Sequence, residues 1–145
     1  MWHTHGIAEL ARAMADGRLT AVALTRHFLD RIDALNQAGP ALNAVREINP
    51  AALDIAEALD AQRRAGRVRG PLHGIPVLLK DNIATGDGMA CTAGSLALAS
   101  LRPPRDAGLV RRLRAAGAVI LGKCNMTEFA DYLSDLMPSE FSSAG

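Results

Sequence analysis

The chain has 145 residues, a length that fits one ordinary domain with room for a sizeable core. Its formal net charge of +1 is too balanced to favour nucleic acid or an acidic membrane surface as a partner. Only 3% of the residues are aromatic, so the core must be built from Ala, Leu, Val and Ile. Two cysteines, Cys91 and Cys124, are too few for a disulfide framework, and no apolar run is long enough to span a membrane. We therefore expect a cytoplasmic protein.

Residues 7–66 predict a helical scaffold without a site signature. The apolar residues of Ile7–Met14 share one face of a short helix, which Gly17 would end. Thr20 can cap a second helix, which would stop at Gly39-Pro40. The apolar stripe of this second helix consists of Leu24, Phe28, Ile32 and Leu35.

A short strand and a third helix complete the scaffold. The strand is predicted over Leu42–Ile48. Asn49-Pro50 then supplies an N-cap followed by a proline at the first helical position, which predicts a helix that runs through Ala65. Gly66 lies just past its end, where glycine is the preferred residue.

The stretch from Gly70 to Ile83 is the most informative part of the chain. Its first half is rich in the turn residues Gly and Pro, and its second half contains Ile75–Leu79, an apolar run that predicts a buried strand. This strand delivers Lys80 at its C-terminal end. Because desolvation disfavours the charged form of an amine, a lysine in such a place can accept a proton from a serine hydroxyl.

Lysine is rare in this chain. Of the 16 cationic residues, only Lys80 and Lys123 are lysines, and the rest are arginines. Arginine does not release its proton in proteins, so a lysine kept at this position is consistent with a need for a deprotonable amine. The alternative is a coding bias toward arginine that left two lysines by chance.

The sequence after Lys80 predicts a connection, a helix and a second strand. Ala84–Gly94 is a glycine-rich connection without the Gly-Lys-Ser/Thr pattern of a phosphate loop. Asp106 is the predicted N-cap of the helix, which would end before Gly117. The buried face of this helix is expected to consist of Leu109, Val110 and Leu113. Ala118–Leu121 follows as an apolar strand, so the order of elements predicts a βαβ unit with parallel pairing.

The segment Gly122–Asn125 follows this strand, at the edge where α/β folds commonly place ligand contacts. Lys123 in this segment rivals Lys80 as a candidate base. It sits among glycine and polar residues and not at the end of a longer apolar run, so a structural or surface role is the preferred interpretation.

Three stretches, in their order and at ordinary spacing, resemble the amidase signature family. They are Gly70-Pro-Leu-His-Gly-Ile-Pro-Val-Leu-Leu-Lys-Asp-Asn-Ile83, Cys91-Thr-Ala-Gly-Ser95, and Arg105-Asp106 through Gly117-Ala-Val-Ile-Leu-Gly-Lys-Cys-Asn-Met-Thr-Glu-Phe-Ala130. The resemblance runs from about Ile7 to Gly145. It implies the N-terminal portion of an α/β fold, with helices packed on a mixed, mostly parallel β-sheet that is incomplete in this chain. The helical scaffold would occupy about 7–66, and the start of the sheet core with the active-site lysine about 70–145.

The family hydrolyses or transfers amides through a triad of Ser, cis-Ser and Lys, and the resemblance makes Lys80 the triad lysine. Family spacing from Lys80 places both serines beyond Gly145, so we expect a truncated front part of a longer enzyme, inactive by itself. The nearest serines in the chain are Ser139, Ser142 and Ser143. Their surroundings lack the paired glycines of the family, which favours a loop over a catalytic role.

The resemblance also implies a substrate-binding segment. Met126–Ala130 is expected to begin a short helix capped by Thr127, and the residues after it line the substrate cleft in the family. Tyr132, Leu133 and Ser134 would then lie at the acyl side of the substrate. This chain has Asp131–Ser134 where the family commonly has Met-Gly-Ser-Ser, which leaves the substrate class open.

The implied function is hydrolysis of linear carbon–nitrogen amide bonds other than peptide bonds, through an acyl-enzyme, to an acid and ammonia or an amine. The expected partners are a small-molecule amide and further copies of the chain, with no direct nucleic-acid or membrane partner. No metal or organic cofactor is needed, and His3 and His5 lack the further ligands of a metal site, so a frayed terminus is favoured. Two alternatives remain: an inactive, degenerate amidase-fold module, and the A-type subunit of a tRNA-dependent amidotransferase.

Overall fold

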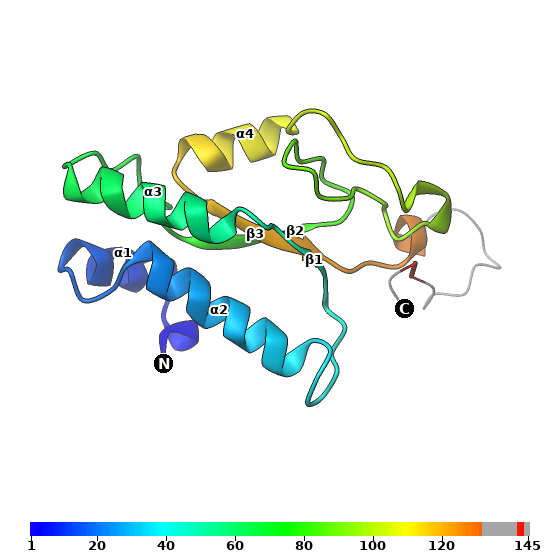
Figure 1. Cartoon of the computed structure of the whole chain (residues 1–145), viewed down its shortest axis with the longest axis horizontal. Coiled ribbons are helices and arrows are strands. Elements are labelled where there is room, and N and C mark those ends of the chain that lie inside the picture. The colour runs from blue at the N-terminus through cyan, green and yellow to red at the C-terminus, as the bar shows by residue number, and fades with distance from the viewer. Residues whose placement is uncertain (132–141, 144–145) are drawn as a thin grey trace.

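The computed structural model describes residues 1–131 and 142–143, and it places helices on both faces of a small mixed sheet (Figure 1). The helices are α1 (Ile7–Ala15), α2 (Ala21–Leu35), α3 (Ala52–Arg64) and α4 (Gly108–Ala115). The strands are β1 (Val45–Ile48), β2 (Pro76–Lys80) and β3 (Val119–Cys124). Three short 3-10 turns are η1 (Trp2–Thr4), η2 (Leu96–Leu98) and η3 (Glu128–Asp131).

The sheet confirms the predicted βαβ unit. Its strand order is β1-β3-β2, with β2 parallel to β3 and α4 in the connection between them. β1 pairs antiparallel with β3, so the described sheet has one parallel and one antiparallel pair. Because β2 and β3 run the same way, their carboxyl ends meet at one edge of the sheet, and residues that follow the two strands are brought together there.

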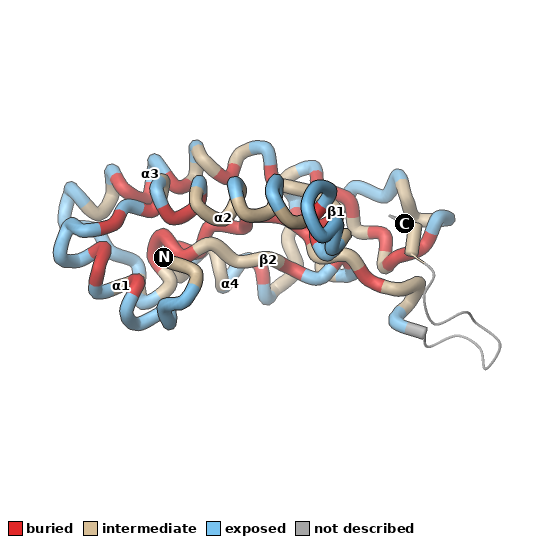
Figure 2. Tube along the Cα trace, turned by 90° about the horizontal axis from the view of Figure 1, so that it is seen from below, coloured by how far each residue is buried: buried red, intermediate tan, exposed pale blue. Residues whose placement is uncertain are grey.

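Two apolar clusters hold the layers together, one on each face of β3. On one face, Val119 and Leu121 pack with residues of α1, α2 and α3. On the other face, Ile120 packs with Leu79 and with Val110 of α4. The buried positions follow the inner sides of the helices, while exposed positions lie on their outer turns (Figure 2). A strand covered on both faces must be apolar throughout, which explains the continuous apolar run in this part of the sequence.

The helical scaffold is present, with one tertiary contact that the sequence pattern did not indicate. The Thr20 hydroxyl accepts a hydrogen bond from the Ala23 N–H at 3.0 Å, which confirms the predicted cap of α2. The buried carboxylate of Asp60, on α3, accepts two further N–H groups at the same end of α2, from Ala21 at 2.8 Å and Val22 at 3.0 Å. A carboxylate is favourable there because the helix N-terminus is electropositive.

Two helix starts differ from the prediction. Asp106 does not cap α4: its carboxylate accepts hydrogen bonds from the Gly86 N–H at 2.8 Å and the Arg114 Nε–H at 3.0 Å, and the N-cap is Ala107. Leu109, expected on the buried face of α4, is 45% exposed, while Val110 is buried.

Similarly, α3 begins at Ala52 and not at Pro50. Asn49 still satisfies the start of this helix, because its side-chain oxygen accepts from the Ala51 N–H at 3.0 Å, but its amide also donates to the Ile120 carbonyl at 2.8 Å. Asn49 is thus attached to the central strand, and α3 begins two residues after the predicted first position, Pro50.

Strand β3 is longer than predicted. It continues through Gly122, Lys123 and Cys124, which pair with residues of β1. A side chain at position 122 would collide with the Glu47 carbonyl of β1, so glycine permits this close pairing. The parallel partner β2 pairs with the same three residues, so the end of β3 is fixed by two partners that lie elsewhere in the sequence.

The N-terminal residues contact α2. η1 packs beside α2, where the His3 Nδ1 lies 3.1 Å from the His27 Nε2 and the two rings stack. Among the residues that the structure describes, no helix has both the length and the apolarity needed to cross a bilayer.

Candidate active site

Lys80 lies at the carboxyl end of β2, next to the carboxyl end of β3. Its ammonium donates a hydrogen bond of 2.6 Å to the backbone carbonyl of Asn125, the residue that follows β3. Leu79, one residue earlier, is buried, but Lys80 is exposed, so the expectation of a desolvated amine is wrong for the described chain. Lys80 therefore stands at the rim of the sheet, where solvent and a ligand can reach it.

The residue that follows this lysine, Asp81, carries a buried carboxylate. Asp81 has no exposed surface, and its Oδ2 accepts a hydrogen bond from the Thr92 hydroxyl. The Nε of Arg46, on β1, lies 3.4 Å from the same oxygen. The other carboxylate oxygen has no hydrogen-bond partner among the described residues. Asp81 thus joins the end of β2 to β1 and to the connection that leads to α4.

The turn after Thr92 packs against the chain that follows β3. Gly94 has a φ of +74°, and a Cβ there would meet the Thr127 carbonyl oxygen at 2.6 Å, so only glycine fits without strain. The Ala93 carbonyl accepts from the Phe129 N–H at 2.8 Å. Phe129 and Ala130 themselves have positive φ, so the helix predicted from Met126 is a kinked 3-10 turn beginning at Glu128.

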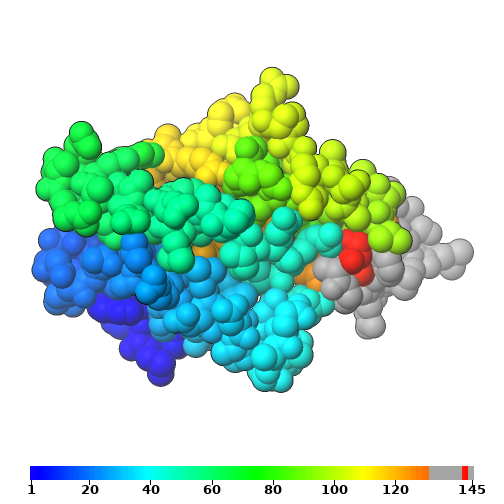
Figure 3. Space-filling model, in the orientation of Figure 1, coloured from blue at the N-terminus to red at the C-terminus, as the bar shows by residue number. Residues whose placement is uncertain are grey.

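Two serines near the end of the chain lie at this edge. The Ser142 hydroxyl donates to the Asn125 side-chain oxygen at 2.6 Å, and Arg46 donates to the Ser143 hydroxyl at 2.8 Å. The Ser143 N–H donates to the Gly94 carbonyl at 2.9 Å. In Figure 3, residues 142–143 (red) lie between the cyan segment that leads into β1 and the yellow-green segment that contains η2. The third candidate serine, Ser139, lies outside the described residues.

Lys123 occupies an environment opposite to that of Lys80. It lies inside β3, has no exposed surface, and donates to the backbone carbonyls of Ile83 at 2.7 Å and Ala90 at 2.9 Å. Burial lowers the pKa of Lys123, against the opposing attraction of Cys91 and nearby carboxylates. The alternative of a surface role is therefore wrong, and its contacts are those of a structural anchor for the connection after β2.

The two cysteines are free and half-buried. Burial raises the pKa of the Cys91 thiol, although nearby Lys123 opposes that shift. Burial likewise raises the pKa of Cys124, with Lys80 acting in the opposite direction. Both residues are therefore held as thiols, which are weak nucleophiles.

The predicted substrate-binding residues Tyr132, Leu133 and Ser134 lie outside the described residues. The sequence did not single out Arg46, Thr92 and Asn125 as site residues. Arg46 carried a usable signal, because an arginine within a short strand that joins a sheet needs a polar partner. Thr92 and Asn125 each lie in one of the three family-like stretches, and Asn125 also ends the segment Gly122–Asn125 that we expected at the ligand edge. The sequence does not indicate that the Asn125 carbonyl accepts from Lys80.

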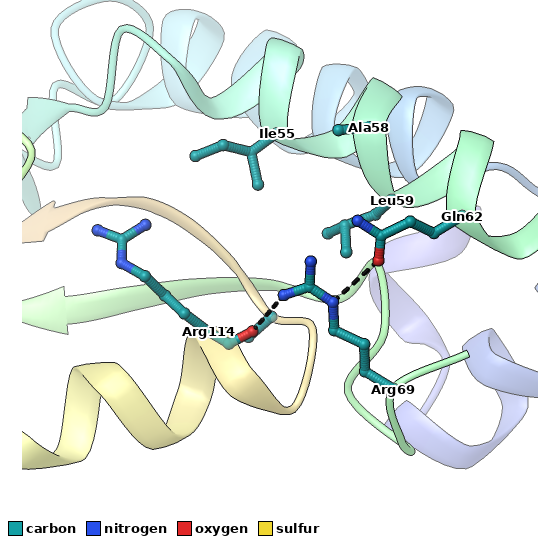
Figure 4. Close-up of a pocket in the computed structure, with 7 residues that line it drawn as sticks. Ile55, Ala58, Leu59, Gln62, Arg69 and Arg114 are labelled. Carbon is teal, nitrogen blue, oxygen red and sulfur yellow. Dashed lines mark hydrogen bonds between the residues drawn. The ribbon is translucent and has the colours of Figure 1, made fainter. Parts of the chain in front are cut away.

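A separate cavity of about 240 Å³ lies between α3 and α4 (Figure 4). It is lined by Ile55, Ala58, Leu59, Gln62, Arg69, Arg114 and Ala118. Arg69 crosses it, donating to the Gln62 side-chain oxygen and to the Arg114 carbonyl, each at 2.9 Å. Its lining does not include Lys80, so the candidate site is defined by the strand ends and not by this cavity.

Comparison with known proteins agrees with this arrangement. The family model named Amidase matches residues 23–135. The A-type subunit of the glutamyl-tRNA(Gln) amidotransferase of Salinispora arenicola is 50% identical over 123 residues, which cover 85% of this chain and 24% of that protein. The chain spans about a quarter of the length of the curated relatives it matches.

Solved structures give the same result. The native peptide amidase of Stenotrophomonas maltophilia is 52% identical, with a TM-score of 0.90 over 96% of this chain and 28% of that one. An amidase family protein of Bacillus anthracis strain Ames is 42% identical, with a TM-score of 0.87 over 95% of this chain and 27% of that one. The chain belongs to the amidase signature family, of whose members it matches the N-terminal part.

Proposed function

We propose that this chain forms the front part of an amidase that hydrolyses linear amide bonds other than peptide bonds, with Lys80 as its catalytic base. The observation that carries the proposal is the position of Lys80 at the carboxyl edge of the parallel pair, with its ammonium 2.6 Å from the Asn125 carbonyl. This is the edge where open α/β sheets bind ligands. Family membership supports an amide as the ligand.

The proposed reaction is acyl transfer in two steps. Neutral Lys80 accepts the proton of the cis-serine, which in turn takes the proton of the nucleophilic serine as that serine attacks the amide carbon. Backbone N–H groups stabilise the oxyanion. The proton held by Lys80 returns through the cis-serine to the amide nitrogen, and the tetrahedral intermediate collapses to an acyl-enzyme as ammonia or the amine leaves. Water then attacks the ester and gives a proton through the cis-serine to Lys80. The same path returns this proton to the nucleophilic serine as the acid is released, which restores both hydroxyls and neutral Lys80. The route requires neither a metal nor an organic cofactor.

Both serines of this scheme belong to the segment that family spacing places after Gly145. The amidotransferase subunit of Salinispora arenicola is about three and a half times as long as this chain. Additional chain packed at this edge would remove Lys80 from water. Removal from water is the condition in which a lysine amine works as a base. Because the longer relatives have this additional chain, the exposure of Lys80 in the described residues does not contradict its proposed role as a base.

A chimera provides the test. Residues 1–145 would replace the matching front part of the Stenotrophomonas maltophilia peptide amidase, and ammonia release from a peptide amide would be measured. We expect activity in the chimera and a loss of at least about a thousandfold in Lys80→Ala, because removing one member of a triad removes most of the catalysis. Lys80→Arg is the matched control, since it keeps the charge but cannot release its proton, and it should be equally inactive. Activity near that of the unsubstituted chimera in either variant would contradict the role of Lys80.

One observation favours a second candidate function. The 50% identity to the A-type subunit of an amidotransferase is about as high as the identity to the peptide amidase. In this second function the chain would release ammonia for transfer to the substrate of a partner protein, so glutamine in place of the peptide amide distinguishes the two candidates. An inactive chimera with an intact fold would favour the third interpretation, a degenerate amidase-fold module.

A further inference from the structure

The Thr92 hydroxyl connects two backbone segments that border the candidate site. Thr92 has no exposed surface, its hydroxyl donates to Asp81 Oδ2, and the same oxygen accepts from the Gly94 N–H at 3.1 Å. A hydroxyl has one proton, and a carboxylate can only accept, so the direction of both bonds is fixed. Thr92 is therefore held in one orientation between the residue after Lys80 and the turn at Gly94.

Each end of this link leads to a different part of the site. Toward β2, the Asp81 N–H donates to the Cys124 carbonyl and the Asp81 carbonyl accepts from the Ala93 N–H, both at 3.2 Å. Toward the end of the chain, the Gly94 carbonyl accepts from the Ser143 N–H at 2.9 Å. The turn therefore has Lys80 on one side and, on the other, the segment that leads toward the serines of the proposed function.

We propose that Thr92 is a positioning residue that sets the place of the chain following β3 relative to Lys80. The expected effect of Thr92 on catalysis rests on the proposed function. The hydrogen bonds of Thr92 to Asp81 and Gly94 do not depend on that function. Without the hydroxyl, the Gly94 N–H loses its acceptor, and the buried Asp81 Oδ2 keeps only Arg46, at 3.4 Å, among the described residues. Buried groups left without partners are costly, so the turn moves to regain them. A shift of about 1 Å at a site is enough to cost on the order of a hundredfold in rate.

The chain offers a matched control. Thr25, on α2, is also fully buried, and its hydroxyl has no hydrogen-bond partner among the described residues. Thr92→Val and Thr25→Val make the same chemical change at the same burial, and only the first removes a link to the site. Thr92→Ser restores the hydroxyl without the methyl group and serves as the rescue.

The first measurement is amide hydrogen exchange on the full chain. In Thr92→Val, we expect the protection of Gly94, Phe129 and Ser143 to fall by at least about tenfold, with the amides of β3 unchanged. Thr25→Val and Thr92→Ser should retain the protection of the starting chain. Equal protection of these three amides in Thr92→Val and Thr25→Val would overturn the proposal.

The second measurement uses the chimera at a temperature where every variant is folded. Thr92→Val should lower kcat by about ten- to a hundredfold with KM unchanged, and Thr92→Ser should recover most of the loss. A role confined to stability would leave kcat of the folded enzyme unchanged, and that result would also overturn the proposal. If the unsubstituted chimera is inactive, the proposed function fails, and the exchange measurement alone decides whether Thr92 holds the turn.

Discussion

The last residue of β2 and the penultimate residue of β3 are lysines, and the two lie one residue apart in the register of the parallel pair. Cys124 is the partner of Lys80, and Lys123 is the partner of Leu79. Lys123 is fully buried and donates to two backbone carbonyls, whereas Lys80 is exposed and reaches the carbonyl of Asn125. The difference shows that the contacts of these two lysines follow from how deeply each is buried in the sheet. Of the two, only the lysine at the rim is exposed to solvent.

Selective acylation gives the largest expected contrast between the two lysines. An amine-reactive ester should acylate Lys80 in the native chain and spare Lys123, because reaction at Lys123 requires the structure to open. We expect the two rates to differ by at least about a thousandfold, measured by mass spectrometry of peptides. In concentrated urea the two rates should become equal, which is the control. Similar rates under native conditions would contradict the buried position of Lys123.

Substitution should separate the two lysines by stability. Lys123→Ala leaves the carbonyls of Ile83 and Ala90 without a buried donor and opens a cavity, so the free energy of unfolding should fall by about 2–4 kcal/mol. Lys80→Ala removes an exposed side chain and should change it by less than about 0.5 kcal/mol. Urea denaturation of both variants beside the starting chain measures the difference. Equal losses would show that the rim contact of Lys80 is also structural.

The smallest expected effect is the pH dependence of stability that burial of Lys123 causes. It is small because the attraction of nearby carboxylates limits how far burial lowers the pKa of Lys123. That pKa lies below its ordinary value of 10.5, so between the two values the unfolded chain binds more protons than the folded chain. The contribution of Lys123 to stability therefore rises with pH across this window and is lowest below it. The measurement is the difference in urea midpoint between the starting chain and Lys123→Met, which should grow as pH approaches 10.5. The two free cysteines are present in both proteins, so their titration contributes to both urea midpoints. A difference in midpoint that does not change with pH would contradict this account.

The sequence predicted those features that depend on local pattern. Apolar periodicity and cap residues gave α1 and α2, and the short apolar run before Lys80 placed this residue at a strand end. The order of strand, helix and strand gave the parallel pair, since a connection of that length returns the chain in the same direction. The family-like stretches then indicated which edge of the sheet mattered.

The features that sequence missed depend on contacts between distant residues. The sequence placed Lys123 after its strand because glycine, here Gly122, normally weakens a strand. In the structure β3 continues past Gly122 because both β2 and β1 pair with residues 122–124. Aspartate is a common helix N-cap, which is why the sequence predicted that role for Asp106. In the structure its carboxylate instead accepts hydrogen bonds from Arg114 and from the Gly86 N–H. The exposure of Lys80 depends on which elements cover the rim, and no local pattern encodes that.

The pairing of β1 with β3 also bears on the order in which the molecule folds. Val45 and Cys124 are partners although about 80 residues separate them, whereas β2 and β3 are joined through a connection about half as long. Closing a long loop costs more chain entropy and slows the contacts that depend on it. The helices can therefore form early, and β1 should join the sheet late. Arg46 lies on β1 and contacts Asp81, so we expect the edge that carries Lys80 to be completed late in folding.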